Sequence, residues 1–293
     1  MSKIAYVNGQ YLSHSLAKVH IEDRGYQFAD GVYEVIAIHE GKFLGEKGHL
    51  NRLAHSLEAL RIDWPMDKRP LSMVMREVRR RNRVRNGLLY LQITRGVAPR
   101  DHAFPNPSVS TLVITVTKRP AIDKAELLAG IEIITTPDLR WKRRDIKSIS
   151  LLPNVLAKQA AIEAGAQEAW QVDEKGFVTE GSATNAWIVT KSGELITRDA
   201  GEEILNGITR LAILEAVQDQ DIKLLYRPFS VTEARDAREA FISSSNSHVR
   251  AVTKIDGKAI GNGLAGELTR RLLDIYMEFM EGEGGPQQEA RWN

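Results

Sequence analysis

The amino-acid sequence predicts a protein of the α+β class that folds into two domains. At roughly 150 residues per domain, its 293 residues are enough for about two hydrophobic cores. Stretches rich in β-branched and apolar residues are interspersed with stretches whose apolar residues recur at helical spacing. Residues 118–124 contain a proline and several charges, which is typical of a surface connector between domains.

The first half begins with two expected hairpins. Asn8-Gly9 lies between short apolar stretches and suits a tight turn with positive φ angles. Residues 32–39 and 42–44 flank Glu40-Gly41 as a second hairpin. A helix should follow, because four leucines recur at helical spacing: Leu50, Leu53, Leu57 and Leu60. The remaining expectations for this half are a helix at 71–85 and strands at 88–94 and 111–117.

We place the domain boundary in the connector. The expected N-terminal domain is residues 1–119, and the expected C-terminal domain is residues 120–281. Residues 282–293 are polar and glycine-rich and are expected to form a flexible tail. In the second domain we expect strands at 131–135, 169–172, 177–179, 186–190, 223–226, 240–243 and 249–255, and helices at 154–164, 209–219 and 264–280.

Composition excludes several classes of function. Forty lysines and arginines against 38 acidic residues leave a net charge of +2, too little to concentrate nucleic acid or an anionic membrane. The absence of cysteine excludes disulfides, thiolate metal sites and a cysteine nucleophile, and it fits a reducing cytoplasm. No apolar run approaches the roughly 20 residues that span a bilayer. We therefore expect a cytoplasmic protein with a small-molecule partner and no metal.

A basic stretch at residues 140–148 contains the first candidate for chemistry. Five of its nine residues are lysine or arginine, and a solvated surface strand is the simplest interpretation. Lys147 differs from the others because it follows Ile146 and precedes the apolar pair Leu151-Leu152. Partial burial beside other cations would favour a neutral, nucleophilic amine.

Two further stretches could contribute to the same site. Glu180 lies in a glycine-containing turn before an apolar strand, where it is either a solvated turn residue or a fixed anion that keeps a heterocyclic nitrogen protonated. Residues 205–210 open a helix with a glycine and a hydroxyl residue, where unpaired backbone N–H groups bind phosphate. The polar loop 243–247 could add hydroxyl donors. An amine, a fixed carboxylate and a phosphate site are what pyridoxal phosphate requires, although spacing alone does not select these residues.

At these residues the chain resembles the class IV pyridoxal-phosphate aminotransferases of fold type IV, and most of all the D-amino acid aminotransferases. The resemblance extends from about Ile4 to Phe279. It implies a smaller N-terminal α/β domain and a larger, barrel-like C-terminal domain. The blocks that carry it are residues 24–34, 145–148 with 154–158, 179–182 with Asn185, 207–210 and 94–102.

The resemblance also implies roles for individual residues. Lys147 would form the internal Schiff base with pyridoxal 5'-phosphate, and Glu180 would pair with the pyridine nitrogen. The implied phosphate-binding groups are Arg52, Ser245 and the backbone amides of Ile208 and Thr209. The implied substrate-carboxylate set is Tyr33, Arg100 and His102. In the family the loop with the last two residues reaches into the neighbouring subunit, so a homodimer is expected.

The implied reaction is transamination between a D-amino acid and a 2-oxo acid, such as D-alanine plus 2-oxoglutarate giving pyruvate plus D-glutamate. A branched-chain aminotransferase or an aminodeoxychorismate lyase would have a similar cofactor end. A basic nucleic-acid-binding protein is a more distant alternative, based on six arginines in one expected helix: Arg76, Arg79, Arg80, Arg81, Arg83 and Arg85. These arginines surround the helix, and no aromatic residue is interleaved for base stacking.

Overall fold

The computed structural model of the chain describes residues 3–218 and 220–281, so the expected tail at 282–293 lies outside the described residues. The chain forms two compact units. The first contains the chain up to residue 121 together with residues 146–150, and the second contains residues 122–145 and the chain from 151 onward. The units change close to the expected boundary at residue 119. The sequence did not predict that the segment with Lys147 belongs to the first unit.

The first unit contains a six-stranded antiparallel sheet with the strand order β2-β1-β6-β5-β3-β4. Its strands are β1 (Ile4–Val7), β2 (Gln10–Ser13), β3 (Gly31–His39), β4 (Lys42–Phe43), β5 (Gly87–Thr94) and β6 (Thr111–Lys118). Both expected hairpins are confirmed. Their turn residues have positive φ angles, 43° and 92° at Asn8 and Gly9 and 46° and 82° at Glu40 and Gly41.

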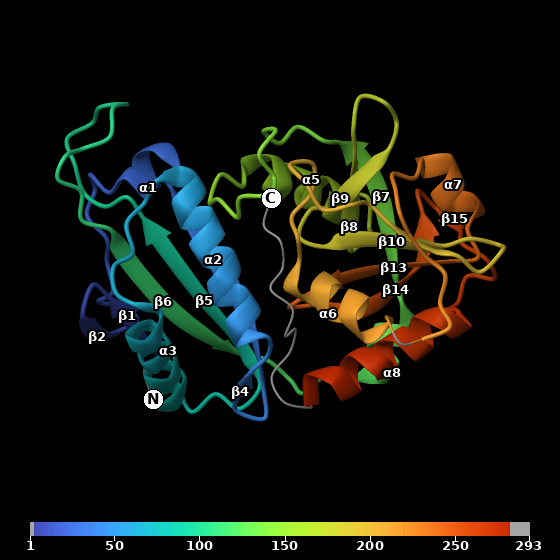
Figure 1. Ribbon diagram of the computed structural model, residues 1–293, viewed down its shortest axis with the longest axis horizontal. Helices are drawn as coiled ribbons and strands as arrows, with labels where there is room; N and C mark the ends of the chain where they lie inside the picture. The colour runs from blue at the N-terminus through green and yellow to red at the C-terminus, as the bar shows by residue number, and fades with distance from the viewer. Residues whose placement is uncertain (1–2, 219, 282–293) are drawn as a thin grey trace. The chain divides into compact units, whose positions relative to one another are not determined.

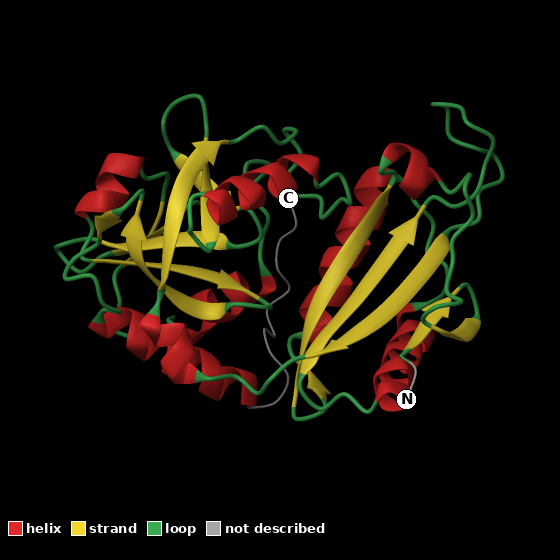
Figure 2. Cartoon of the chain, turned by 180° about the vertical axis from the view of Figure 1, so that it is seen from behind, coloured by secondary structure: helices red, strands yellow, loops and turns green. Residues whose placement is uncertain are grey.

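Three helices belong to this unit: α1 (Arg24–Phe28), α2 (Glu46–Leu60) and α3 (Lys68–Asn82). Helices α2 and α3 cover one face of the sheet, and Figure 2 shows the unit from the other side (Figure 1). Val32 and Ile36 of β3 join the core with leucines of α2. Because side chains alternate along a strand, Tyr33 of β3 and Tyr90 of β5 lie on the helix-free face.

Helix α3 does not present a stripe of uncompensated positive charge. Arg76 pairs with Glu46, and Arg80 and Arg81 both pair with Glu77. The Arg79 guanidinium donates to a backbone carbonyl instead. These pairs remove the main reason for the nucleic-acid alternative.

The second unit is built on a nine-stranded sheet with the order β12-β11-β10-β13-β14-β7-β8-β9, and β15 pairs with β14. The sheet curls, because β9 returns to pack beside β10. Its strands are β7 (Ile131–Pro137), β8 (Glu168–Val172), β9 (Val178–Gly181), β10 (Asn185–Val189), β11 (Leu195–Thr197), β12 (Leu224–Tyr226), β13 (Glu239–Ser244), β14 (His248–Ile255) and β15 (Lys258–Ala259). Its helices are α4 (Lys124–Ala129), α5 (Leu152–Glu163), α6 (Ile208–Ala216), α7 (Val231–Asp236) and α8 (Glu267–Glu281).

The expected strands and long helices of the second unit are present, with shifted ends. Helix α8 was expected from residue 264 but begins at Glu267, because the buried carboxylate of Glu239 accepts hydrogen bonds from the backbone amides of Leu268 and Thr269 at 3.1 and 2.8 Å. The sequence analysis missed three short helices, α1, α4 and α7, and the short strands β11 and β15. No helix in the described part of the chain has both the length and the apolar character needed to cross a membrane.

Candidate active site

Lys147 is held by backbone contacts along the first residues of β3. The amide of Tyr33 donates to the carbonyl of Lys147 at 3.0 Å, and the amide of Ile149 donates to the carbonyl of Gly31 at 3.0 Å. The backbone amide of Lys147 donates to the buried Ser56 Oγ on α2 at 3.1 Å. Both backbone polar groups of Lys147 are therefore fixed, so its side chain leaves the segment from a defined position.

The amine of Lys147 lies over the ring of Tyr33, with Nζ 4.2 Å from the ring centroid. Tyr33 packs against Tyr90, with ring centroids 5.8 Å apart. Burial and the neighbouring Tyr33 raise the pKa of Tyr90 to about 12, so its hydroxyl is protonated and donates to Gln92 at 2.6 Å. Among the residues that the structure describes, the Lys147 amine makes no hydrogen bond or ion pair. This half-buried amine is therefore available for chemistry.

Arg52 belongs to a buried charged cluster that the sequence analysis did not find. Its Nε and Nη2 donate to the two carboxylate oxygens of Glu34 at 2.8 and 2.7 Å. His49 Nδ1 lies 2.7 Å from Glu34 Oε2. Burial opposes ionisation of Glu34, but Arg52 and His49 outweigh it and lower the pKa of Glu34 to about 2. Burial lowers the pKa of His49, so a neutral imidazole donates from Nδ1 to the carboxylate.

Arg100 and His102 lie in the loop between β5 and β6, where they share one aromatic neighbour. The Arg100 guanidinium carbon is 4.5 Å from the centroid of the Phe28 ring, and the His102 and Phe28 rings are 5.3 Å apart. The structure thus brings together two members of the expected carboxylate set. No described hydrogen bond or ring contact joins them to the third member, Tyr33, within the same chain.

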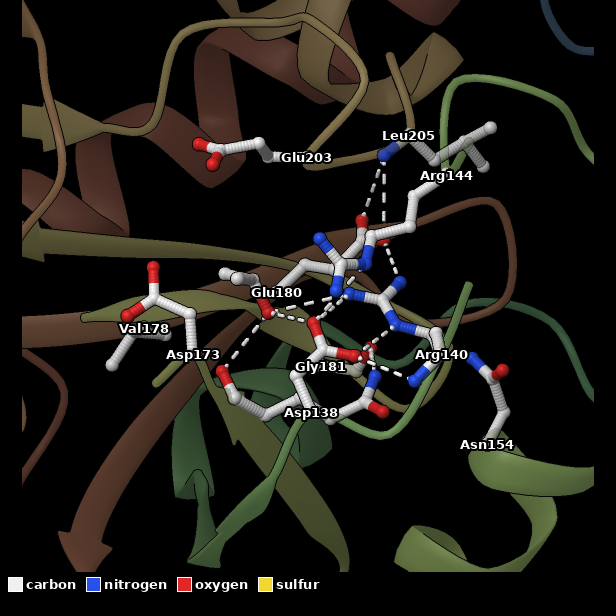
Figure 3. A network of polar contacts seen from close by, with 12 residues as sticks. Asp138, Arg140, Arg144, Asn154, Asp173, Val178, Glu180, Gly181, Glu203 and Leu205 are labelled. Carbon is white, nitrogen blue, oxygen red and sulfur yellow. Dashed lines mark hydrogen bonds and ion pairs between the residues drawn. The ribbon is translucent and has the colours of Figure 1, made fainter. Parts of the chain in front are cut away.

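In the second unit, Glu180 is a buried carboxylate surrounded by donors (Figure 3). It lies in β9 and accepts a hydrogen bond and ion pair from Arg140. Asn185 Nδ2 donates to it at 3.1 Å, and the backbone amide of Leu205 lies 3.2 and 3.3 Å from its two oxygens. The solvated turn residue considered from the sequence is therefore excluded, and the fixed anion is what the structure contains.

Arg140 connects Glu180 to a second buried acid. Its Nη2 donates to Asp138 at 2.7 Å, and Thr179 Oγ1 donates to the same carboxylate at 2.7 Å (Figure 3). Burial raises the pKa of Glu180, and Arg140 limits that rise. The pKa of Asp138 is lowered, because hydrogen bonds from Arg140 and Thr179 outweigh its burial. The basic stretch at 140–148 is thus an internal ion-pair network at Arg140 instead of the solvated strand considered above.

Asn185 connects Glu180 to the beginning of α6. Besides its bond to Glu180, Asn185 Nδ2 donates to the carbonyl of Leu205 at 2.9 Å. Gly207 follows as the N-cap of α6, without a side-chain hydrogen bond that caps the helix. A Cβ at residue 207 would lie 2.1 Å from Asn185 Oδ1, so only glycine fits there. The first amides of α6, those of Ile208 and Thr209, accordingly have no capping side chain and suit an anion.

The remaining expected phosphate ligand, Ser245, follows β13 in the turn before β14 and is half-buried. Helix α6 packs against β13 in the same unit. No cluster of three or more histidine, cysteine, aspartate or glutamate side chains that could hold a metal ion is found in the described part of the chain. The roles expected for Ser245 and the other site residues stay predictions.

Sequence comparison identifies relatives along nearly the whole chain. Residues 31–255 match the family described as amino-transferase class IV. A D-alanine aminotransferase from Staphylococcus haemolyticus is 38% identical over 282 residues, which are 96% of this chain and 99% of the relative.

Solved structures share the fold at lower identity. The branched-chain amino acid aminotransferase of Escherichia coli has a TM-score of 0.88 at 22% identity and covers 100% of this chain and 98% of its own. A branched-chain amino acid aminotransferase from T.th., solved with pyridoxamine 5'-phosphate, has a TM-score of 0.87 at 24% identity and covers 96% and 95%. These likenesses confirm the expected α+β fold of fold type IV.

Glu34 should contribute stability that depends on pH. An unperturbed glutamate side chain has a pKa of 4.5, and that of Glu34 is about 2 in the folded protein, so its stabilisation is present in full above about pH 5 and is lost as the pH falls toward 2. We expect Glu34→Gln to lower the free energy of unfolding by about 3 kcal/mol at pH 7, and the difference from wild type to shrink at low pH. Urea unfolding at a series of pH values measures this.

The matched control is Glu58→Gln, because Glu58 lies on the exposed side of α2. It should change stability little at any pH. A Glu34→Gln variant as stable as this control at pH 7 would contradict the importance of the buried cluster.

Proposed function

The chain belongs to the class IV aminotransferases, and we propose that it uses pyridoxal 5'-phosphate to transfer an amino group from a D-amino acid to a 2-oxo acid. A representative reaction converts D-alanine and 2-oxoglutarate into pyruvate and D-glutamate. The D-alanine aminotransferase of Staphylococcus haemolyticus supports the choice of substrate, because its 38% identity extends over 96% of this chain. The absence of cysteine fits a cytoplasmic enzyme, which stays our expectation.

The observation that carries this proposal is the connection between Glu180 and α6. Pyridoxal phosphate has a basic ring nitrogen at one end and a phosphate at another. A buried carboxylate and an uncapped helix N-terminus match these two groups, and Asn185 and Leu205 link them by hydrogen bonds of 2.9 to 3.2 Å. The cradle at Gly207, which any Cβ would fill, also fits a bound anion. Arg52 and Ser245 are the proposed additional phosphate ligands.

Glu180 would hold a proton on the ring nitrogen of the cofactor. When bound, the cofactor supplies an aldehyde that takes up the substrate amine and a ring that accepts electrons from the α-carbon. A carboxylate fixed by Arg140, Asn185 and the Leu205 amide needs no reorganisation to stabilise positive charge beside it.

Lys147 is the proposed base that moves the substrate α-proton. Its backbone is anchored by Tyr33 and Ser56, so the amine can travel only as far as its side chain allows. The neighbouring Tyr33 ring favours the cationic form of the amine after it has taken up the proton. The Tyr33 hydroxyl is also a candidate donor to the substrate carboxylate.

Arg100 and His102 are the proposed main partners of that carboxylate. A guanidinium binds a carboxylate with two parallel hydrogen bonds, and an imidazole adds a further donor. Within one chain, no described hydrogen bond or ring contact joins this pair to Tyr33. We propose a homodimer in which the β5–β6 loop of one subunit completes the site of its partner.

The other class IV reactions remain alternatives because the cofactor end would be similar. The structural likeness to branched-chain aminotransferases at 22% and 24% identity concerns the fold and does not favour their substrates. Assays with D-alanine, L-leucine and aminodeoxychorismate separate the three activities. A clear preference for either of the last two would overturn the choice of substrate.

The holoenzyme should absorb visible light, and D-alanine should change its spectrum much more than L-alanine does. We expect Lys147→Ala to remove the absorbance of the lysine-bound cofactor and to lower transamination about a thousandfold, because one amine supplies both the covalent link and the base. Lys142→Ala is the matched control, since Lys142 is an exposed lysine of the same basic stretch. A yellow, active Lys147→Ala enzyme would end the proposal.

Mixed dimers test whether the loop acts across subunits. Lys147→Ala and Arg100→Met subunits are each expected to be nearly inactive alone. A dimer purified with one of each, through two different affinity tags, should regain about half of the wild-type activity, because one of its two sites has both residues. If Arg100 acts within its own subunit, neither site is complete and activity stays at the level of the single variants.

A further inference from the structure

A buried arginine holds the backbone of the β5–β6 loop, residues 95–110. Arg24 begins α1, and its side chain is only 4% exposed. Its Nη1 donates to the backbone carbonyls of Asp101 at 2.5 Å and Ala103 at 3.3 Å. The side chains of the loop between Pro99 and Phe104 are exposed, and Figure 1 shows the loop extending past the sheet beside α1. An exposed loop of this length would otherwise sample many conformations.

One carboxylate, that of Asp30, holds Arg24 and a second arginine in place. Arg24 Nε donates to Asp30 Oδ2 at 2.8 Å, and Arg95 donates to both oxygens of Asp30 at 2.8 and 2.9 Å. The Arg95 guanidinium carbon also lies 3.7 Å from the centroid of the Phe104 ring in the loop. Burial opposes ionisation of Asp30, but hydrogen bonds from Arg95 and Arg24 outweigh it and lower its pKa. Asp30 therefore anchors the loop at two places.

Phe28 supports the side chains that the loop presents. Its ring lies 4.8 Å from the Arg24 guanidinium carbon and 4.5 Å from that of Arg100, and the His102 ring is 5.3 Å away. A guanidinium on an aromatic face keeps its N–H groups directed outward in the plane of the group. In residues 3–218 and 220–281, no hydrogen bond or ion pair uses the Arg100 guanidinium. All its donors are therefore available to a ligand.

We propose that Asp30 and Phe28 are positioning residues for the substrate carboxylate. Asp30 fixes the loop backbone through Arg24, and Phe28 orients the side chains of Arg100 and His102. This inference rests on the proposed function, in which Arg100 and His102 bind that carboxylate. The conformational entropy of ordering the loop is then lost when the protein folds instead of when substrate binds, which increases affinity.

The proposal predicts an effect on carboxylate recognition that does not depend on the substrate side chain. D-alanine and 2-oxoglutarate both present a carboxylate next to the reacting carbon, so loss of positioning should weaken both. D-alaninol keeps the amine and the handedness of D-alanine but lacks the carboxylate. Its reaction with the holoenzyme, followed by the change in visible absorbance, should not depend on Phe28.

The experiment compares Phe28→Leu, Phe28→Tyr and Asp30→Asn holoenzymes with wild type. We expect Phe28→Leu and Asp30→Asn to raise KM about tenfold for D-alanine and 2-oxoglutarate, with kcat changed less than about twofold. The rate with D-alaninol should stay at the wild-type value. Phe28→Tyr keeps the aromatic face and should restore the wild-type KM. Val109→Ala is the matched control, because Val109 lies in the same loop and is 80% exposed.

The possible results separate this inference from the proposed function. A wild-type holoenzyme without D-alanine activity disproves the proposed function itself. An active wild type with Phe28→Leu and Asp30→Asn variants that behave like Val109→Ala overturns the positioning role. An equal loss with D-alanine and D-alaninol, or a Phe28→Tyr variant as weak as Phe28→Leu, also overturns it, because damage to the fold does not distinguish ligands by their carboxylate. Phe28→Leu removes only a half-buried ring, so it tests the proposal even if Asp30→Asn does not fold.

Discussion

The two hydrogen bonds that Asn185 donates determine the geometry of the second unit's functional groups. One reaches the carboxylate of Glu180 and the other reaches the carbonyl of Leu205, two residues before the N-cap of α6. An acid in a strand and the N-terminus of a helix are thereby held at a constant spacing. The close approach of Asn185 to Gly207 makes glycine necessary at the N-cap. A site arranged in this way before any ligand binds has little reorganisation to undergo.

The same device occurs in both units: each charged group with a proposed role has a buried partner of opposite charge. Arg52 is held by Glu34 in the first unit, and Glu180 is held by Arg140 in the second. Removing such pairs from water costs free energy that their attraction roughly offsets, so they add little net stability. What they add is direction, because a bidentate carboxylate restricts a guanidinium to one plane. A solvated arginine or glutamate would lose this order to side-chain motion.

Sequence reasoning succeeded where the signal is local. The leucine spacing of α2 and the turn residues Asn8 and Gly9 determine their structures through neighbours in the chain. It failed where the partner is distant: Arg140 lies 40 residues from Glu180, and nothing around it distinguishes it from other arginines. Lys147 and Glu180 were identified because they lie in family motifs. The partner of Arg52, Glu34, adjoins a candidate in the sequence, yet only the pairing of β3 with α2 shows its role.

The way the loop is anchored explains how one fold could serve different substrates. Aminotransferases with 22% identity share this fold at a TM-score of 0.88, so the fold constrains the reacting substrate weakly. Arg24 contacts carbonyl groups of the loop, which every residue type possesses. Side chains at positions 100 and 102 can therefore change without loss of the Arg24 anchor. An anchored backbone with exposed, replaceable side chains permits substrate preference to diverge while the cofactor end, tied together by buried polar contacts, stays constant.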